Sequence, residues 1–364
     1  MNTSVHPWRR PLAGLLILPL IGACSPTYLF HVGVGHARIM MARRPYADVL
    51  KDPAATSQDK SLLLEVQQVK RFGEERLGLA DTDNFDSFVR LDRPAVSWIV
   101  VGAEKTRLSA HEWWFPFVGR VPYKGYYNPD QARREAAALE RRGLDVDVRP
   151  VAAYSTLGYF ADPVFSTFLR FPEAAIPELI LHELTHATLF ARGQVDFNEG
   201  FATFVGQKGG LAFLEERYGA DSPLVAESLA RSRDELAFGR FVGEVSERLE
   251  ALYESPLSDE EKIARREKVF RESKLSFAKL RERFSSNSYD DFAEAEWNNA
   301  VILANRRYYG DLPRFETLYA ALGGDLEKFV AYFVDAKERG EDLTDALERG
   351  GNPPGGAKTG KERS

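Results

Sequence analysis

The sequence predicts an α+β fold that is mainly helical and has a small antiparallel sheet. Two observations indicate strands: β-branched residues run through 95–101, and apolar and polar residues alternate over 144–154. Helices are indicated by apolar residues at helical spacing over most of the remaining chain, above all in the long charged segment 222–285. A chain of 364 residues is long enough for one large globular domain or two smaller ones.

The first residues predict a secretory signal rather than part of the fold. Arg9-Arg10 precedes an apolar run from Leu12 to Leu20 that is too short to span a bilayer well. Small residues then lead to Cys24, and this pattern resembles the lipobox of bacterial lipoproteins. Cys24 is the only cysteine and has no partner for an internal disulfide, so acylation explains its place; an ordinary signal peptide with an incidental cysteine is the alternative.

We therefore predict a lipoprotein signal peptide over residues 1–23 and a membrane contact through a lipid on Cys24. Several acyl chains would anchor the protein firmly. By resemblance to bacterial lipoproteins, Ser25 after the cysteine indicates the outer membrane, so we expect a protein of the bacterial cell envelope that faces the periplasm. The net charge of −6 gives no sign of a nucleic-acid partner.

Elements of both kinds are predicted between the tether and the centre of the chain. Apolar spacing predicts a helix at 57–79, and a second, charged helix is expected at 129–142, ahead of Gly143. The aromatic stretch 111–117 is expected to pack in the core or against the sheet, with a substrate cleft as the alternative.

The central helix is predicted to begin near Pro177, which suits a first helical position because its missing N–H costs nothing there. Gly193 suits the left-handed residue just past the helix end. The helix contains the sequence His182-Glu183-Leu184-Thr185-His186. Residues four apart lie on one face of a helix, so the two imidazoles can bind one Zn²⁺ while Glu183 reaches the water of the metal.

A third ligand is expected, since hydrolytic zinc usually takes three protein ligands and leaves one position for water. Glu199 begins the next apolar-periodic segment, and a short turn over 193–196 would fold that segment back on the two histidines. The alternative for Glu199 is a capping box with Asp196 as N-cap, which needs no metal. We predict one Zn²⁺ per chain, held by His182, His186 and Glu199.

The motif and its surroundings resemble known families. H-E-x-x-H with a downstream glutamate resembles the gluzincin metallopeptidases, and Asn198–Ala202 resembles the N-E-x-F-A element of the aminopeptidase-N-like group. The shorter spacing and the flanks resemble a bacterial lipoprotein family named putative or predicted aminopeptidases. This resemblance spans nearly all of the mature chain and rests on Tyr123–Tyr126, Ala153–Gly158, Asp162-Pro163, the block from His182 to Ala202, and Asn298–Ala300.

The resemblance implies a zincin-like fold in which the small sheet lies beside the active-site helix and its edge strand, expected over 154–159, pairs with the substrate. Tyr154 or Tyr159 would donate a hydrogen bond to the developing oxyanion, and packing is the alternative for each. The G-x-M-E-N motif that binds the substrate amine in the aminopeptidase-N-like group is missing. Asp162 is a candidate replacement, with an Asp-Pro turn as the alternative.

Helices are expected after the metal site as well. Thr203 lies one turn after Glu199 and is a candidate partner for a ligand histidine. Gly209-Gly210 is expected to interrupt its helix, and 222–285 is expected to form a helical hairpin with a break near Pro256. The tail 350–364 is rich in Gly, Pro and Lys and is expected to be disordered, which leaves 24–349 as the metallopeptidase domain.

The function predicted from the sequence is zinc-dependent peptide hydrolysis, with Glu183 as general base and an aminopeptidase as the first choice. An endopeptidase or oligopeptidase on the same site is one alternative, and peptides with free and acetylated N-termini would separate the two. The other alternative is a non-enzymatic, zinc-stabilised envelope lipoprotein. Glu183 argues against it, because a structural zinc site needs no general base. Oligomeric state and side-chain preference are not predicted.

Overall fold

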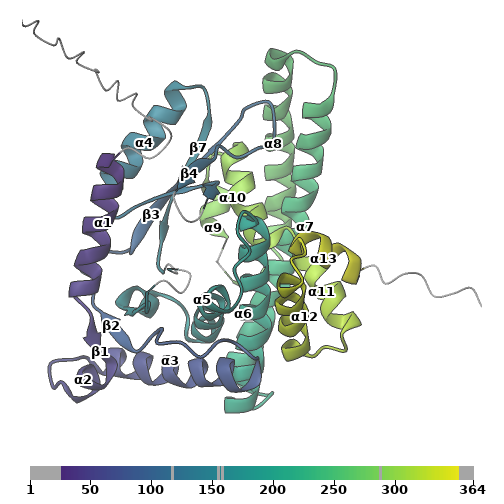
Figure 1. Cartoon of the computed structure of the whole chain (residues 1–364). Helices are drawn as coiled ribbons and strands as arrows, with labels where there is room; N and C mark the ends of the chain where they lie inside the picture. The colour runs from purple at the N-terminus through teal and green to yellow at the C-terminus, as the bar shows by residue number, and fades with distance from the viewer. Residues whose placement is uncertain (1–25, 116–118, 154–155, 157–159, 287–288, 352–364) are drawn as a thin grey trace, which may run out of the picture.

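The computed structural model describes residues 26–351 except 116–118, 154–155, 157–159 and 287–288 (Figure 1). It is an α+β structure in which helices predominate, as the sequence predicts. The expected signal peptide, the edge strand over 154–159 and most of the C-terminal tail fall on residues outside this description, so those predictions stay untested. Among the described residues, every helix is too short or too polar to cross a membrane.

The described N-terminal part of the chain is mainly helical. Helix α1 (Pro26–Met41) leads through β1 (Arg44–Pro45) and α2 (Tyr46–Lys51) to α3 (Ser57–Arg76). A capping box fixes the start of α3: Thr56 accepts from the Asp59 backbone N–H, and the Asp59 carboxylate accepts from the Thr56 backbone N–H. Strand β2 (Ser87–Val89) joins antiparallel β1 to parallel β8 (Val164–Phe165) in a small sheet.

The larger sheet has β3 (Ser97–Ala103) between the antiparallel strands β6 (Lys124–Tyr126) and β7 (Asp145–Val151). Its two faces pack against different helices. Val100 packs with α4 (Pro129–Arg141), and Val101 packs with α10 (Asn299–Tyr309). Burial on both faces explains why β3 is apolar from Trp98 to Ala103 rather than alternating.

A short hairpin of β4 (Trp113–Phe115) and β5 (Gly119–Val121) flanks this sheet. Trp113 is buried and donates a hydrogen bond to Glu135 of α4 (3.1 Å), as expected for an aromatic stretch that packs on the sheet. Trp114, on the other face of β4, is 51% exposed.

Two helices form the centre of the molecule: α5 (Ile176–Thr188) and α6 (Val195–Tyr218). The expected interruption at Gly209-Gly210 is wrong, because α6 runs through both glycines. They serve close packing instead. A Cβ built on Gly210 would lie 2.8 Å from the backbone nitrogen of Glu178 in α5, and one built on Gly206 would lie 2.7 Å from the Glu178 carbonyl oxygen. The two helices therefore touch backbone to backbone.

The C-terminal half is helical. The predicted hairpin over 222–285 is confirmed as α7 (Pro223–Glu254) and α8 (Asp259–Arg281), which project together from one side of the molecule (Figure 1). Helix α9 (Asp290–Glu294) precedes α10. Helices α11 (Leu312–Ala321) and α12 (Leu326–Glu338) then pack against α6 through Phe315, Phe329 and Phe333, and α13 (Leu343–Gly351) packs against α11 and α12.

Buried polar contacts join the sheet to this helical half. Asp145 of β7 accepts hydrogen bonds from the Arg266 guanidinium of α8 (2.6 Å) and from the Asn299 backbone N–H (3.0 Å), and Asp145 and Arg266 are each 6% exposed. Asn298 caps α10 by accepting from Val301 and donates to the Val146 carbonyl. The asparagines in the Asn298–Ala300 stretch thus hold α10 on the sheet.

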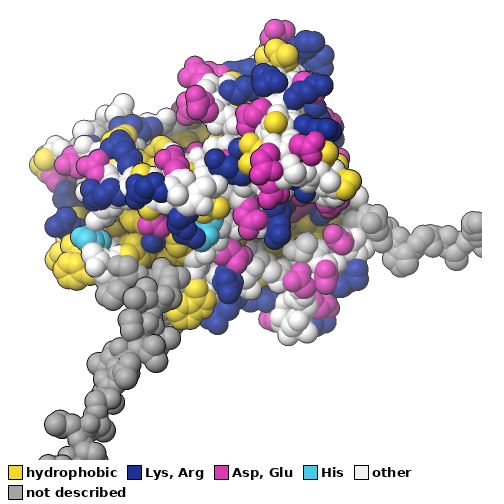
Figure 2. Space-filling view, turned by 90° about the horizontal axis from the view of Figure 1, so that it is seen from above, with side chains coloured by type: hydrophobic (Ala, Val, Ile, Leu, Met, Phe, Trp, Pro, Cys, Tyr) yellow, Lys and Arg dark blue, Asp and Glu magenta, His cyan; other side chains and the backbone are white. Residues whose placement is uncertain are grey.

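Charges of both signs are distributed over the surface. Seen from above, Lys and Arg side chains lie along the side of the molecule where Figure 1 places α4, and elsewhere on this face acidic and basic side chains are interspersed (Figure 2). The exposed arginines of α4 and its end are Arg133, Arg134, Arg141 and Arg142. Interspersed charges of this kind are typical of solvated helix faces.

Candidate metal centre

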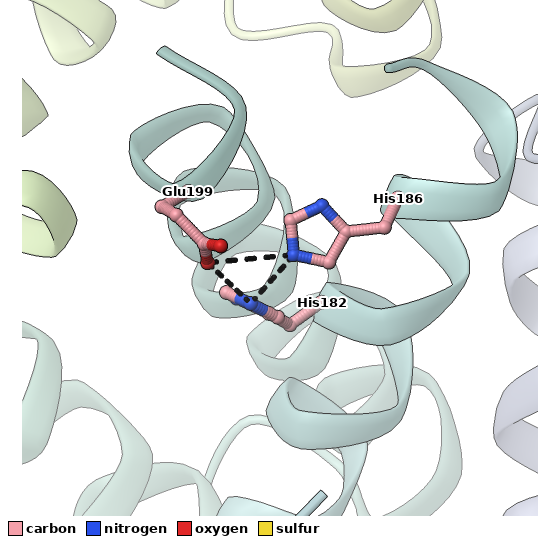
Figure 3. Close-up of side chains that lie close together, drawn as sticks. All are labelled: His182, His186 and Glu199. Carbon is pink, nitrogen blue, oxygen red and sulfur yellow. Dashed lines mark hydrogen bonds and ion pairs between the residues drawn. The ribbon is translucent and has the colours of Figure 1, made fainter. Parts of the chain in front are cut away.

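The turn between α5 and α6 brings His182, His186 and Glu199 together (Figure 3). Helix α5 ends at Thr188 with Leu189 as its C-cap, earlier than its apolar pattern suggests, so Gly193 does not directly follow the helix as predicted, although it does take a positive φ (81°) in the turn. The side chain of Asn198 closes the turn, since its amide accepts from the Ala191 N–H and donates to the Ala191 carbonyl, both at 2.8 Å. This fixes the first turn of α6 against the end of α5.

The separations of the three donor atoms suit one zinc ion. The two histidine Nε2 atoms lie 3.1 Å apart, and the Glu199 Oε2 atom lies 3.6 Å from that of His182 and 3.5 Å from that of His186. Ligands about 2.0–2.1 Å from a tetrahedral zinc ion are about 3.3 Å from one another. The side chains are 16%, 7% and 12% exposed in chain order, so the centre is largely but not fully shielded from solvent.

The alternative for Glu199, a capping box with Asp196, is wrong. Helix α6 begins at Val195 with Gln194 as its N-cap, and no side chain caps it, so Asp196 already lies inside the helix. Asp196 instead pairs with Arg307 of α10 (2.9 Å). Glu199, one turn further on, is left to face the histidines.

The charges of Glu199 and of the two histidines stabilise one another. Burial would raise the pKa of Glu199, but the charges of His186 and His182 and their hydrogen bonds outweigh it and hold that pKa well below its usual range. Burial likewise would lower the pKa of His186, but Glu199 outweighs it and raises that pKa. Two imidazoles and a carboxylate that stays ionised are a suitable donor set for Zn²⁺.

Glu183 lies next to the cluster and is only partly buried. Desolvation raises its pKa, and although His182 and His186 act against this, the charge of Glu199 adds to the rise. A carboxylate whose pKa is moved toward neutral pH is better suited to accept and return a proton than an ordinary glutamate.

Two tyrosines that the sequence did not single out for a role lie at the centre. The Tyr308 ring stacks beside that of His182, with 6.4 Å between centroids. Burial raises the pKa of the Tyr123 hydroxyl, and the charges of Glu199 and Glu183 raise it further. Tyr123 lies in one of the stretches that carry the family resemblance, but no local pattern in the sequence marks Tyr308.

The other predicted site residues lie elsewhere or form other contacts. Tyr154 and Tyr159 fall outside the described residues. Asp162 is buried, and its carboxylate accepts from the Thr156 N–H (2.8 Å) while its own N–H donates to Asn84 (2.8 Å). Thr203 is buried in α6, and within the described part of the chain it forms no hydrogen bond to either histidine. Among the described residues, the buried Nδ1 atom of His186 has no hydrogen-bond partner.

A cavity of about 820 Å³ adjoins the start of α6. The pair of Asp196 and Arg307 lines it, and the Arg307 guanidinium also lies over the Tyr123 ring, 5.4 Å from its centroid. The cavity therefore adjoins the His182–His186–Glu199 centre through the first turns of α6, which carry Asp196 and Glu199, whereas the two histidines come from α5. Its volume is within the usual range for small-molecule sites.

Comparison with known families gave one result. A family model described as "Putative aminopeptidase" matches residues 27–343, which is most of the chain. Comparisons with curated proteins and with solved structures gave no match.

Proposed function

From the premise that this chain belongs to the family described as "Putative aminopeptidase", we propose that it is a zinc-dependent peptidase of gluzincin type with a zincin-like fold. The observation that carries the proposal is the set of three donor atoms, two imidazole nitrogens and one carboxylate oxygen, at 3.1–3.6 Å from one another with Glu183 beside them. A structural zinc site has four protein ligands, which leave no open position, and it needs no base. A hydrolytic site has three protein ligands and a nearby base.

His182, His186 and Glu199 would hold the zinc ion. When bound, zinc supplies Lewis acidity to the peptide carbonyl and to a water molecule. Glu183 accepts a proton from the attacking water and returns it to the leaving amine, for which its raised pKa suits it. The low pKa of Glu199 keeps that carboxylate anionic and available as a ligand.

Tyr308 is the candidate that this proposal favours for stabilising the oxyanion. Its ring is stacked beside that of His182, with 6.4 Å between centroids, and we assign to its hydroxyl the hydrogen bond to the oxygen that develops negative charge at the centre. Burial and the charge of Glu199 raise the pKa of Tyr308 well above its usual value, which keeps the hydroxyl protonated as a donor. Tyr154 and Tyr159 remain alternatives for the same role.

The proposal places the protein in the bacterial cell envelope. It retains the lipid on Cys24 and the outer-membrane location, which rest on the sequence alone. The substrate would be a peptide reached from the periplasm. An endopeptidase or oligopeptidase on this site would differ from an aminopeptidase only in the part of the substrate that lies beyond the scissile bond. The chain lacks the G-x-M-E-N motif that binds the substrate amine in the aminopeptidase-N-like group.

Metal dependence tests the proposal. Purified protein should contain one zinc ion per chain by elemental analysis and cleave members of a peptide library. Removal of zinc with a chelator should abolish cleavage, and addition of zinc should restore it. His186→Ala should lose both zinc and activity, while His111→Ala, at a histidine of the neighbouring cavity, should keep its zinc. A protein that cleaves peptides equally well with and without metal would overturn the proposal.

A further inference from the structure

The cavity of about 820 Å³ lies close enough to the metal centre to hold part of a substrate. Residues 193–197 at the start of α6 line it, together with His111 and with Arg142 at the end of α4. Asp196 in the cavity and Glu199 at the metal are three residues apart, which is roughly 4.5 Å along the helix axis. Each residue of an extended peptide spans about 3.3–3.6 Å. A peptide held at the metal therefore reaches the cavity with a group one or two residues from the scissile bond.

The start of α6 lines the cavity with backbone donors that no side chain caps. Gln194 is the N-cap residue, but its Oε1 atom accepts from the backbone N–H groups of Leu343 (2.9 Å) and Thr344 (3.4 Å) instead. Asn198 is the first residue whose N–H bonds to the Gln194 carbonyl (2.9 Å). The N–H groups of residues 195–197 have no acceptor within the part of the chain that the structure describes. Free N–H groups at a helix start favour an anion.

A buried arginine lines the same cavity with half of its guanidinium unpaired. The Arg307 side chain is 2% exposed. Its Nε atom donates to Asp196 (2.9 Å), and its guanidinium lies over the Tyr123 ring. Its two terminal nitrogens, Nη1 and Nη2, form no hydrogen bond with any described residue. The terminal nitrogens of a guanidinium can bind both oxygens of one carboxylate. Buried donors left unpaired in this way are expected to have a ligand or water.

The charges of the cavity favour an anion as well. Arg142 is exposed and forms no ion pair with the residues that the structure describes. His111 adds no charge at neutral pH, because burial and the charge of Arg142 lower its pKa. Every other charged side chain of the lining is paired with an opposite charge: Arg307 with Asp196 (2.9 Å), Arg306 with Glu250 (2.6 Å), Arg120 with Glu112 (3.7 Å) and Glu104 with Arg107 (3.7 Å). The cavity therefore has a surplus of positive charge.

We propose that this cavity binds a carboxylate of the substrate, and that this carboxylate is the C-terminus of a short peptide. The inference rests on the proposed peptidase function and specifies its substrate as a dipeptide or tripeptide with a free C-terminus. Arg307 binds the carboxylate oxygens with its terminal nitrogens, the N–H groups at the start of α6 donate to the same oxygens, and Arg142 balances the charge. An Asp or Glu side chain at the same place in the substrate offers the same chemical group.

Kinetics on matched peptides test this site. The zinc-loaded full chain is given Ala-Ala and Ala-Ala-Ala, each beside its C-terminal amide. Wild type should cleave the free acids with a kcat/KM about tenfold or more above that of the amides, because charged hydrogen bonds are lost in the amides. Ala-Glu-amide carries its carboxylate on the side chain only. A higher kcat/KM for Ala-Glu-amide than for Ala-Ala would overturn the assignment to the C-terminus.

Two variants and a matched control identify the residues. Arg307→Lys keeps the charge but removes the guanidinium fork, so KM for the free acids should rise about tenfold or more while the amides are unaffected. Arg142→Gln should weaken the preference for the acids in the same direction, and decides if Arg307→Lys does not fold. Arg141→Gln changes an exposed neighbour outside the cavity lining and should keep the preference of wild type. Equal losses on acids and amides would show a structural role and overturn the site.

Binding separates the failure of this site from the failure of the peptidase. Calorimetry on Glu183→Gln, in which no turnover is expected, should show Ala-Ala bound about tenfold or more tightly than Ala-Ala-amide. Adding Arg142→Gln should reduce that difference. Equal affinities, or equal cleavage of acids and amides by wild type, would overturn the carboxylate site and leave the zinc peptidase in place. Preferential binding of the acid without cleavage of any peptide by wild type would support the site and contradict the peptidase.

Discussion

Tyr308 lies in the last turn of α10 with its ring stacked beside His182, and its neighbour Arg307 is tied to α6 by the ion pair with Asp196. Its position is therefore fixed from two sides by the residues next to it. A hydroxyl held in this way stabilises developing charge without having to reorganise at the moment of reaction. Its removal should affect the rate more than substrate binding.

We expect Tyr308→Phe to lower kcat about 10²–10³-fold with little change in KM, the effect of removing one donor to an oxyanion. Zinc content should stay at one ion per chain, because the side chain is not a ligand. Steady-state kinetics on a peptide substrate measure this. Tyr319→Phe on α11 is the control and should behave as wild type. A rise in KM without loss of kcat would assign Tyr308 to substrate binding instead.

The packing of α5 on α6 sets the geometry of the metal centre at the scale of whole elements. Gly206 and Gly210 let the α6 backbone approach that of α5 around Glu178, one turn before His182. Any side chain larger than hydrogen would move the helices apart. The separation of Glu199 from the two histidines depends on that approach.

Gly210→Ala should lower the free energy of unfolding by about 1–3 kcal/mol, because its Cβ would lie 2.8 Å from backbone atoms of α5. The affinity for zinc should fall as well. Urea unfolding and a zinc-binding titration measure the two effects. Gly243→Ala in α7 is the matched control. Its Cβ has no neighbour within 4 Å, so stability should be unchanged or rise by up to about 1 kcal/mol. Equal effects of both changes would contradict the packing argument.

Sequence reasoning succeeded where the structural cause is local. The pairing of His182 with His186 follows from helical spacing. It failed where the cause is a distant segment. Gly209-Gly210 was expected to break α6 because its real partner, Glu178 of α5, is not visible in the local pattern. The capping box at Asp196 was wrong for the same reason, since Asp196 is held by Arg307 far along the chain.

The same limit applies to the site itself. Glu199 could be placed by assuming a short turn, but the Asn198 side chain that closes this turn was not recognised from the sequence. Tyr308 reaches the centre only through the packing of α10 on α6, and no sequence signal distinguishes it from an ordinary helix residue.

For the molecule as a whole, Glu235 makes stability depend on pH. Its folded pKa is raised above the unfolded value, so the folded state binds more protons than the unfolded state between the two pKa values. The contribution of this carboxyl is fully present below the unfolded pKa and is lost as pH rises toward the folded pKa. The loss amounts to at most about 1.4 kcal/mol for each pH unit.

Glu235→Gln removes this titration. We expect the free energy of unfolding of wild type, relative to that of Glu235→Gln, to fall as pH rises from 5 to 8, as measured by urea unfolding at each pH. Glu316→Gln, whose carboxylate is half exposed, is the control and should keep a constant difference from wild type. A difference that is also constant for Glu235→Gln would mean that Glu235 is ionised in the folded protein at all of these pH values.

The most direct test of the account compares wild type with Glu183→Gln. Both proteins are analysed for zinc and then incubated with the same peptide library. We predict one zinc ion per chain in both, with cleavage by wild type only, because Glu183 moves protons but does not hold the metal. The new ends of the products would also show whether residues are removed from the amino terminus. Undiminished cleavage by Glu183→Gln, or full zinc in both proteins with no cleavage by either, would contradict the proposed peptidase.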